Sequence, residues 1–228
     1  MEIQILQQLE GAKQAKGLAV IIDVFRAFTT ECVFMANGAK EIFAVGEEKI
    51  AYALKSECPD YILAGERKEI MLPGFDYGNS PAKIKEIDFT NQTIVHTTSA
   101  GTQGIANASY AEEIITGSFV NASAIAQYIK QKNPKIVSLV CMGKAAVSPT
   151  EEDTFCAEYI KSLLLEQSYP LAQKLACLRY LEGKRFFRPE NQEQCPEEDF
   201  FIATTPNQFD FVLKAIPDKR GFHRIQKI

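Results

Sequence analysis

The sequence predicts an α/β fold, with a three-layer α/β/α arrangement and a largely parallel or mixed sheet. Short apolar runs alternate with helix-length segments across the first 145 residues, which is typical of strands that are connected by helices. Several of these runs are continuously apolar, as expected for strands buried on both faces of a sheet. No internal repeat or Gly/Ser-rich linker divides the chain, so we expect one domain over residues 1–228, with a two-lobed outline as an option.

Six apolar runs are expected to form strands. They are LAVIID at 18–23, EIFAV at 41–45, YILAG at 61–65, TIVHTT at 93–98, EEIITGS at 112–118 and KIVSLVCMG at 135–143. Two further runs, FFIAT at 200–204 and FDFVLKAI at 209–216, are expected to be short strands that close the sheet.

Helices are expected between and after these strands. A helix in TTECVFMANGAK should have a Thr cap and stop at Gly38, and one in EEKIAYALKSEC carries acids in its first turn. A third, in NASAIAQYIKQKNP, opens on Asn121 and is closed by Pro134. Two successive helices are expected within 148–167 and 169–183.

Composition and charge exclude several functional classes. The chain is 46% hydrophobic, enough for a full core, but its apolar runs are far shorter than the roughly 20 residues that cross a bilayer. Six scattered Cys, no Cys-x-x-Cys pair and only two His argue for reduced thiols and against a zinc site. The net charge of −4 and the lack of a long basic run argue against nucleic-acid binding. Glu2 stands where a signal peptide would be basic, so we expect a cytoplasmic protein.

Polar residues follow almost every predicted strand. Because ligands bind beyond the carboxyl ends of parallel strands, these segments are expected to meet at one edge of the sheet. The hard oxygen donors that suit Mg²⁺ are Asp23, Glu66, Glu152 and Asp153. Arg26 offers a planar fork of donors for phosphate, carboxylate or sulfonate oxygens.

A hydroxyl and glycine turn follows the strand at 93–98. Its members are Thr97, Thr98, Ser99, Gly101 and Thr102. If a helix starts there, its backbone N–H groups would form an anion cradle. A metal, an arginine and an anion cradle together indicate phosphoryl transfer.

Each residue also has an ordinary structural explanation. Asp23 fits a helix N-cap, and Arg26 fits a partner for an acid. The acids at 151–153 are normal in a first helical turn. Thr30 and Asn121 fit helix caps, Ser118 fits a turn, and His96 is more typical of a hydrogen-bonded core histidine than of a proton carrier.

Five segments occur in an order and at a spacing that are specific. They are IIDVFRAFTT with ANGAKEI after it, AGERKEIMLPGFDYGNSP, TIVHTTSAGTQGI, ITGSFVNASAIA and SPTEEDTFCA. Together they resemble the 2-phosphosulfolactate phosphatase family, also called the ComB family. The resemblance implies a Mg²⁺-dependent acid phosphatase that hydrolyses (R)-2-phospho-3-sulfolactate to 3-sulfolactate and phosphate, a step of coenzyme M biosynthesis.

The same resemblance implies a set of site residues. We expect Asp23, Arg26, Glu66 and Asp153 to be catalytic and Asp23, Glu66, Glu152 and Asp153 to hold the metal. The residues expected to bind substrate are Thr30, Asn79, Ser80, Thr97, Thr98, Gly101, Thr102, Ser118 and Asn121. Gly117 also matches the family pattern. A sulfolactate-like substrate needs further cations, for which Arg67, Lys144, Arg185 and Arg188 are candidates.

The chain departs from the family pattern in two places. Family members often have Asn where this chain has Ala100, and a Gly-rich stretch where it has RKEI at 67–70. These differences leave the phosphatase prediction intact and concern the exact substrate, which could be a related 2-phosphorylated acid.

Two nucleophiles are compatible with the sequence, a water molecule and Asp23 itself. The alternative function is a non-catalytic sensor that binds a small anionic metabolite in the same pocket, and metal dependence distinguishes the two. The expected partner is a small anionic phosphorylated substrate, without nucleic acid or membrane, and a homodimer is the common assembly for such enzymes.

Overall fold

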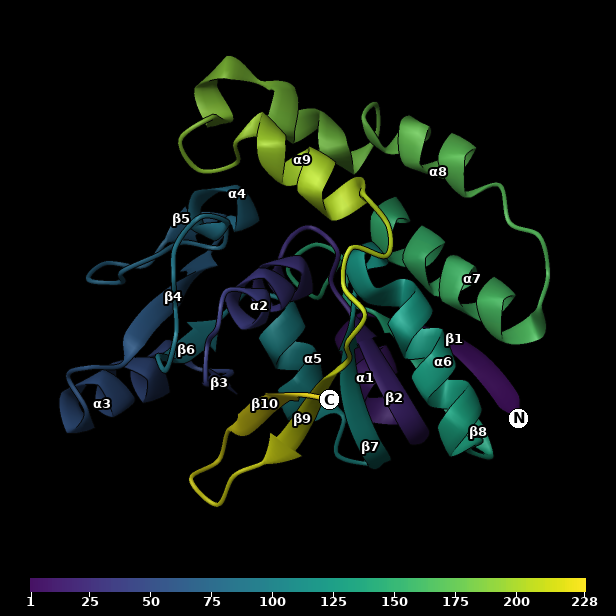
Figure 1. Ribbon diagram of the computed structural model, residues 1–228, viewed down its shortest axis with the longest axis horizontal. Helices are drawn as coiled ribbons and strands as arrows, with labels where there is room; N and C mark the ends of the chain where they lie inside the picture. Colours follow the sequence, from purple (N-terminus) through teal and green to yellow (C-terminus); the bar gives the residue numbers. More distant parts are fainter.

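The computed structural model describes residues 1–228, and its strands form one ten-stranded mixed sheet (Figure 1). The order along the sheet is β1-β8-β2-β7-β9-β10-β3-β6-β4-β5. The strands are β1 (Glu2–Gln7), β2 (Gly17–Ile22), β3 (Glu41–Ala44), β4 (Ile62–Arg67), β5 (Ile70–Met71), β6 (Thr93–Thr97), β7 (Ala111–Gly117), β8 (Ile136–Cys141), β9 (Leu213–Pro217) and β10 (His223–Lys227).

Nine α-helices and three short 3₁₀ helices connect the strands. The α-helices are α1 (Gln8–Gln14), α2 (Ala27–Ala36), α3 (Glu48–Glu57), α4 (Pro81–Ile84), α5 (Gly101–Asn107), α6 (Ala122–Lys132), α7 (Glu151–Leu165), α8 (Leu171–Leu178) and α9 (Glu197–Thr204). The 3₁₀ helices are η1 (Phe119–Asn121), η2 (Glu182–Phe187) and η3 (Pro189–Asn191). No helix has both the length and the apolar character needed to span a bilayer.

The sheet consists of two parallel blocks joined by an antiparallel hairpin. In the first block, β1, β8, β2 and β7 run parallel. In the second block, β3, β6 and β4 run parallel, and β5 is added antiparallel at the edge. The C-terminal hairpin β9–β10 lies between them, paired antiparallel to β7 on one side and to β3 on the other.

This topology corrects the expectation that a parallel arrangement alone brings the strand ends to one edge. Three successive antiparallel pairings separate β7 from β3, so in a flat sheet the two blocks would point in opposite directions. Their carboxyl ends nevertheless line a common cavity. The right-handed twist that accumulates from strand to strand turns the blocks toward one another. Figure 1 shows the two blocks on either side of the hairpin, with α2 and α5 between them.

Three apolar clusters hold these layers together. The largest lies between the blocks and joins Ile21 of β2 and Ile42 of β3 to Phe34 of α2. A second packs Val20 of β2 against α6 and α7, and a third packs Leu63 of β4 against α3. Each block therefore has helices on both faces, in agreement with the predicted α/β/α layering. Because both faces are covered, every residue of β2 is buried.

The predicted elements are confirmed except near the two ends of the chain and at one helix start. All six strands of the first 145 residues are present, but FFIAT belongs to helix α9 and not to a strand. Three acids in the first turn, after Pro196, favour a helix there. The edge strands β1 and β5 and the strand β10 were not expected. Helix α2 begins at Ala27, before the expected Thr cap, and ends ahead of Gly38, whose φ is +91°.

Gly65 lets β4 approach β6 closely. Its φ is +147°, and a Cβ on this residue would lie 2.0 Å from the carbonyl oxygen of Thr97. We expect Gly65→Ala to lower the free energy of unfolding by about 2–4 kcal/mol, because backbone must move to admit the methyl group. Chemical denaturation measures this. The control is Gly74→Ala, where φ is +73° but no atom lies within 4 Å of the added carbon. Equal losses in the two variants would contradict the close approach.

Candidate active site

A cavity of about 320 Å³ lies where the carboxyl ends of β2, β4, β6 and β8 meet. Side chains from both blocks and from the helical segment after α7 line it. The lining residues are Asp23, Phe25, Arg26, Glu66, Lys68, Glu69, Asn79, Ser99, Ala100, Gly143, Lys144, Ala145, Thr150, Glu152, Asp153 and Arg185.

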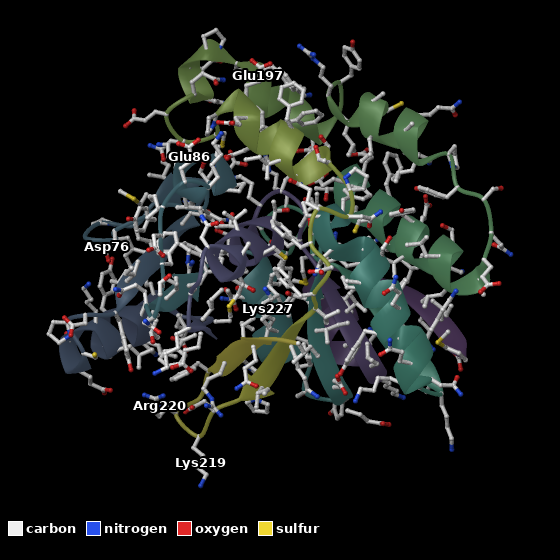
Figure 2. The ribbon with its side chains drawn as sticks, in the orientation of Figure 1. Asp76, Glu86, Glu197, Lys219, Arg220 and Lys227 are labelled. Atoms are coloured by element: carbon white, nitrogen blue, oxygen red, sulfur yellow. The ribbon has the colours of Figure 1, made fainter.

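Four carboxylates of this cavity are withdrawn from solvent. The exposed fractions of Asp23, Glu66, Glu152 and Asp153 are 7%, 6%, 3% and 2%. In contrast, exposed charges such as Lys219 at the hairpin tip and Glu197 on α9 extend from opposite ends of the molecule (Figure 2). Burying four acids in one place is costly unless donors or cations compensate them, so their hydrogen bonds indicate what each can do.

Asp23 stands directly after β2 and reaches both the cavity and helix α2. Its Oδ1 accepts a hydrogen bond of 3.1 Å from the N–H of Ala27, so it does stabilise the first turn of α2. Burial raises the pKa of Asp23 to about 6, and the nearby charge of Glu66 adds to the rise, while the N–H of Ala27 opposes it. A carboxylate in this state gains from a cation beside it.

Glu66, at the end of β4, is held by donors on both oxygens. Its Oε1 accepts from the N–H of Ser99 at 2.7 Å. Its Oε2 accepts from the N–H of Glu69 at 2.7 Å and from the Ser99 hydroxyl at 3.0 Å. These bonds fix the carboxylate at the cavity wall and connect β4 to the turn after β6.

Asp153 and Glu152 lie in the first turn of α7 and differ in their partners. Asp153 accepts from the N–H of Val24 at 2.8 Å and from the N–H of Gly143 at 2.7 Å. Glu152 has a buried Oε2 without any partner. Burial raises the pKa of Glu152 to about 7, against the opposing charge of Arg185. Burial, followed by the charges of Glu152 and Asp23, also raises the pKa of Asp153 well above its usual range.

The turn after β6 is not an open anion cradle. The N–H of Ser99 donates to Glu66, and the N–H of Gly101 lies against Asp23 and lowers its pKa. The N–H of Thr102 donates to the Thr98 hydroxyl, and the N–H of Thr98 to the Thr102 hydroxyl. The expected cradle therefore serves the protein's own carboxylates and hydroxyls.

Arg26 lines the cavity but is tied to a residue that the sequence analysis did not identify. Its Nη1 donates to Asp199 of α9 at 2.9 Å and to the carbonyl of Gln194 at 2.6 Å. Asp199 is fully buried and also accepts from the Ser80 hydroxyl at 2.6 Å and the N–H of Ala82. Burial raises the pKa of Asp199 although Arg26 opposes the rise. The role of Asp199 could not be predicted from the sequence, because acids are common in the first turn of a helix.

The cavity brings together six of the predicted site residues: Asp23, Arg26, Glu66, Asn79, Glu152 and Asp153. The others do not line it: Thr30, Ser80, Thr97, Thr98, Gly101, Thr102, Ser118 and Asn121. Their contacts are with other parts of the protein. Ser118 with Asn121 forms a capping box at η1, so the capping explanation holds for these two residues. Thr30 lies inside α2, where it donates to the carbonyl of Arg26 and is not a cap, and Ser80 donates to Asp199.

Cations line the same cavity as the four acids. Arg185 of η2 donates to the carbonyl of Phe25 at 3.1 Å, contacts Glu69 at 3.2 Å and keeps a buried Nε without a partner. Lys144 and Lys68 also line the cavity, whereas Arg188 does not. Arg67 is used within the fold, since it donates to the carbonyl of Gly46 and to the Thr97 hydroxyl. The only sequence signal for Lys68 and Glu69 was the RKEI stretch at 67–70, which departs from the family pattern.

The raised pKa of Asp23 predicts how stability varies with pH. A carboxyl whose folded-state pKa exceeds its unfolded value favours folding below the unfolded value, and this contribution is lost as the pH rises through the folded value. A change from 3.8 to about 6 corresponds to about 3 kcal/mol. In the presence of a metal chelator, the protein should therefore become more stable as the pH is lowered from 7 to 4. Thermal unfolding measures this change. Asp23→Asn should reduce this gain, whereas Asn at the exposed Asp210 should not. An unchanged pH dependence in Asp23→Asn would contradict the burial argument.

The Arg26–Asp199 pair provides a second test of burial. Asp199→Asn leaves the guanidinium, which is 3% exposed, without a counter-charge, and we expect it to lower the free energy of unfolding by about 3–5 kcal/mol. The neighbouring Glu198 pairs with Lys85 at the surface, so Glu198→Gln should cost less than about 1 kcal/mol. Urea denaturation of the two variants measures the difference. Similar losses of unfolding free energy would show that the negative charge of Asp199 is not required to keep Arg26 buried.

Known proteins resemble this chain over most of its length. Residues 3–188 match the family described as 2-phosphosulpholactate phosphatase. A protein of Bacillus subtilis named probable 2-phosphosulfolactate phosphatase is 30% identical over 224 residues, which cover 96% of this chain and 95% of the relative. A relative of the same name from Thermotoga petrophila is 33% identical, with coverage of 87% and 93%. One from Carboxydothermus hydrogenoformans is 38% identical, with coverage of 73% and 69%.

These matches confirm the resemblance that the ordered segments indicated, because they extend beyond the motifs to nearly the whole chain. The chain belongs to the 2-phosphosulfolactate phosphatase family, a family of enzymes that hydrolyse phosphate esters.

Proposed function

We propose that this protein is a Mg²⁺-dependent phosphatase that hydrolyses (R)-2-phospho-3-sulfolactate to 3-sulfolactate and phosphate, as in coenzyme M biosynthesis. The observation that carries the proposal is the charge distribution of one cavity. Four buried carboxylates line it together with Arg26, Arg185, Lys144 and Lys68. A metal held by the carboxylates and the cations around it would suit a small substrate with several anionic groups. The relatives' names support this choice of substrate.

The donor set fits Mg²⁺. No three His, Cys, Asp or Glu residues lie close enough to form a complete cage, but Mg²⁺ commonly uses one or two carboxylates together with water and substrate phosphate. Asp23 and Glu152 are the best ligands, because Glu152 has an unpartnered Oε2 and burial has raised the pKa of both. Glu66 and Asp153 have donors on both oxygens and would orient the site from beside it. When bound, Mg²⁺ would neutralise charge on the phosphoryl oxygens.

The chain's own residues would position the substrate and the nucleophile. Asp23 presents a carboxylate that can accept a proton from a water molecule or attack phosphorus itself. Arg26 is held in place by Asp199 and adds positive charge at the cavity wall. Arg185, with its unpartnered Nε, is suited to meet the second or third acidic group of the substrate.

Phosphate release tests the reaction, the substrate and the site together. We expect release from 2-phosphosulfolactate that requires Mg²⁺, is abolished by chelator, and exceeds release from other 2-phosphorylated acids such as 2-phospholactate. Asp23→Asn should lower kcat by about 100-fold or more, because it removes the charge of the ligand or nucleophile. The exposed Asp210→Asn variant is the control and should keep the wild-type rate.

Each other outcome assigns a different function. Release from another 2-phosphorylated acid alone would keep the mechanism and change the substrate. Metal-independent binding of 3-sulfolactate without release from any phosphate ester would overturn the enzyme proposal in favour of a metabolite sensor. Normal turnover by Asp23→Asn would contradict the role given to this carboxylate.

A further inference from the structure

A buried acid–histidine pair lies directly behind one side chain of the cavity. His96 of β6 and Glu31 of α2 are both fully buried, and the His96 Nδ1 lies 2.9 Å from the Glu31 Oε1. On the other side of the ring, the His96 Nε2 lies 3.3 Å from the Asn79 Oδ1. Asn79 lines the cavity. A chain of three side chains therefore runs from the core to the site.

The charge of the pair determines which ring nitrogen carries hydrogen. The Glu31 Oε2 is buried without a partner, and no basic side chain is hydrogen-bonded or salt-bridged to Glu31 other than His96. A net negative charge in such a site is costly, so an uncharged pair or an internal ion pair is favoured. In the first case Glu31 donates its proton to Nδ1 and the neutral ring keeps hydrogen on Nε2. In the second case both ring nitrogens carry hydrogen. Both arrangements place an N–H on Nε2.

An N–H on Nε2 determines how the Asn79 amide is oriented. The His96 N–H donates to Oδ1, so Oδ1 is occupied and the NH₂ group is on the other side of the amide. No protein atom accepts from this NH₂, and it is absent from the set of buried polar atoms that lack a partner. Asn79 lines the cavity and also a second pocket that shares Glu69 with it, so the NH₂ group is free to donate to a ligand. The reverse orientation would need an Nε2 without hydrogen. That either leaves the Glu31–His96 pair negatively charged or places the Glu31 proton on Oε2, which is buried without any acceptor.

We propose that His96, held by Glu31, is a positioning residue that keeps the Asn79 amide with its N–H groups toward the cavity, where they donate to an anionic oxygen of the ligand. The consequence for binding rests on the proposed function, since it needs an oxyanion in this cavity. The orientation itself does not. Asn79 would thus add a neutral donor to the charged cavity, which binds an oxygen without changing the charge of the site.

Nuclear magnetic resonance of the imidazole nitrogens tests the orientation without any activity. The chain has only His96 and His223, so a His223→Gln variant identifies the signals of His96. We expect the His96 Nε2 to have the chemical shift and proton coupling of a protonated nitrogen across the range in which the protein is folded. An unprotonated Nε2 would overturn the proposal whether or not the protein is a phosphatase.

Binding measurements test the consequence in the wild-type protein and in variants of the full chain. Titration with inorganic phosphate and with 3-sulfolactate should shift the side-chain NH₂ signal of Asn79, which an Asn79→Ala variant identifies. His96→Leu should weaken binding by about tenfold, equivalent to about 1.4 kcal/mol, and raise KM while kcat changes little. His96→Gln should recover most of the loss, because a Gln amide nitrogen can replace the Nε2 donor.

A double-mutant cycle separates positioning from general packing. If His96 acts through Asn79, the double variant His96→Leu/Asn79→Ala should bind no more weakly than Asn79→Ala alone. Additive losses would overturn the proposal. If His96→Leu does not fold, the proposal is tested with His96→Gln in the same cycle and with the protonation of Nε2 in the imidazole spectrum. Phosphate binding without turnover of any ester would reject the proposed function and leave this inference standing.

Discussion

Holding several carboxylates in one buried cavity is the requirement on which the rest of the site depends. The protein meets it mainly with backbone N–H groups. Glu66 accepts from two of them, Asp153 from two and Asp23 from Ala27. Backbone donors carry no net charge, so they orient the acids without neutralising them. The acids stay available to a cation, and the raised pKa values of Asp23 and Glu152 are the remaining cost.

This requirement explains why both blocks of the sheet are needed. The N–H donors come from segments that follow strand ends, where the backbone is free of ladder pairing: Val24 after β2, Ser99 after β6 and Gly143 after β8. Asp23 and Asp153 belong to the first block and Glu66 to the second. The hairpin β9–β10 is the only strand connection between the blocks in the ladder, so it sets the distance between the two halves of the site. Asp199 bridges them a second time, since it holds Arg26 and Ser80 together.

The features that could be predicted from the sequence are those that burial alone determines. Continuous apolar runs such as the one ending at Ile22 identified the buried strands, and the acids that follow them do meet in the cavity. The features that depend on partners distant in sequence could not be predicted. Nothing near Ser99 shows that its N–H is taken by Glu66, 33 residues away. The link from Asp199 to Arg26 spans 173 residues and leaves no local pattern. The order of the strands is hidden for the same reason, because the hairpin that separates the blocks is the last part of the chain.

Two buried acids outside the cavity fix two consecutive residues, of which Asn79 lines the cavity and Ser80 does not. These acids show two ways of compensating a charge. Asp199 is compensated by Arg26 and holds Ser80 directly. Glu31 has only His96, with which it can share one proton, and it acts on Asn79 through the ring. The first arrangement keeps a guanidinium at the cavity wall, while the second delivers a neutral donor there. The cavity is already lined by five acids and four cations. Asn79 adds a contact of defined direction there without a further charge, and a buried pair with no net charge can supply such a contact.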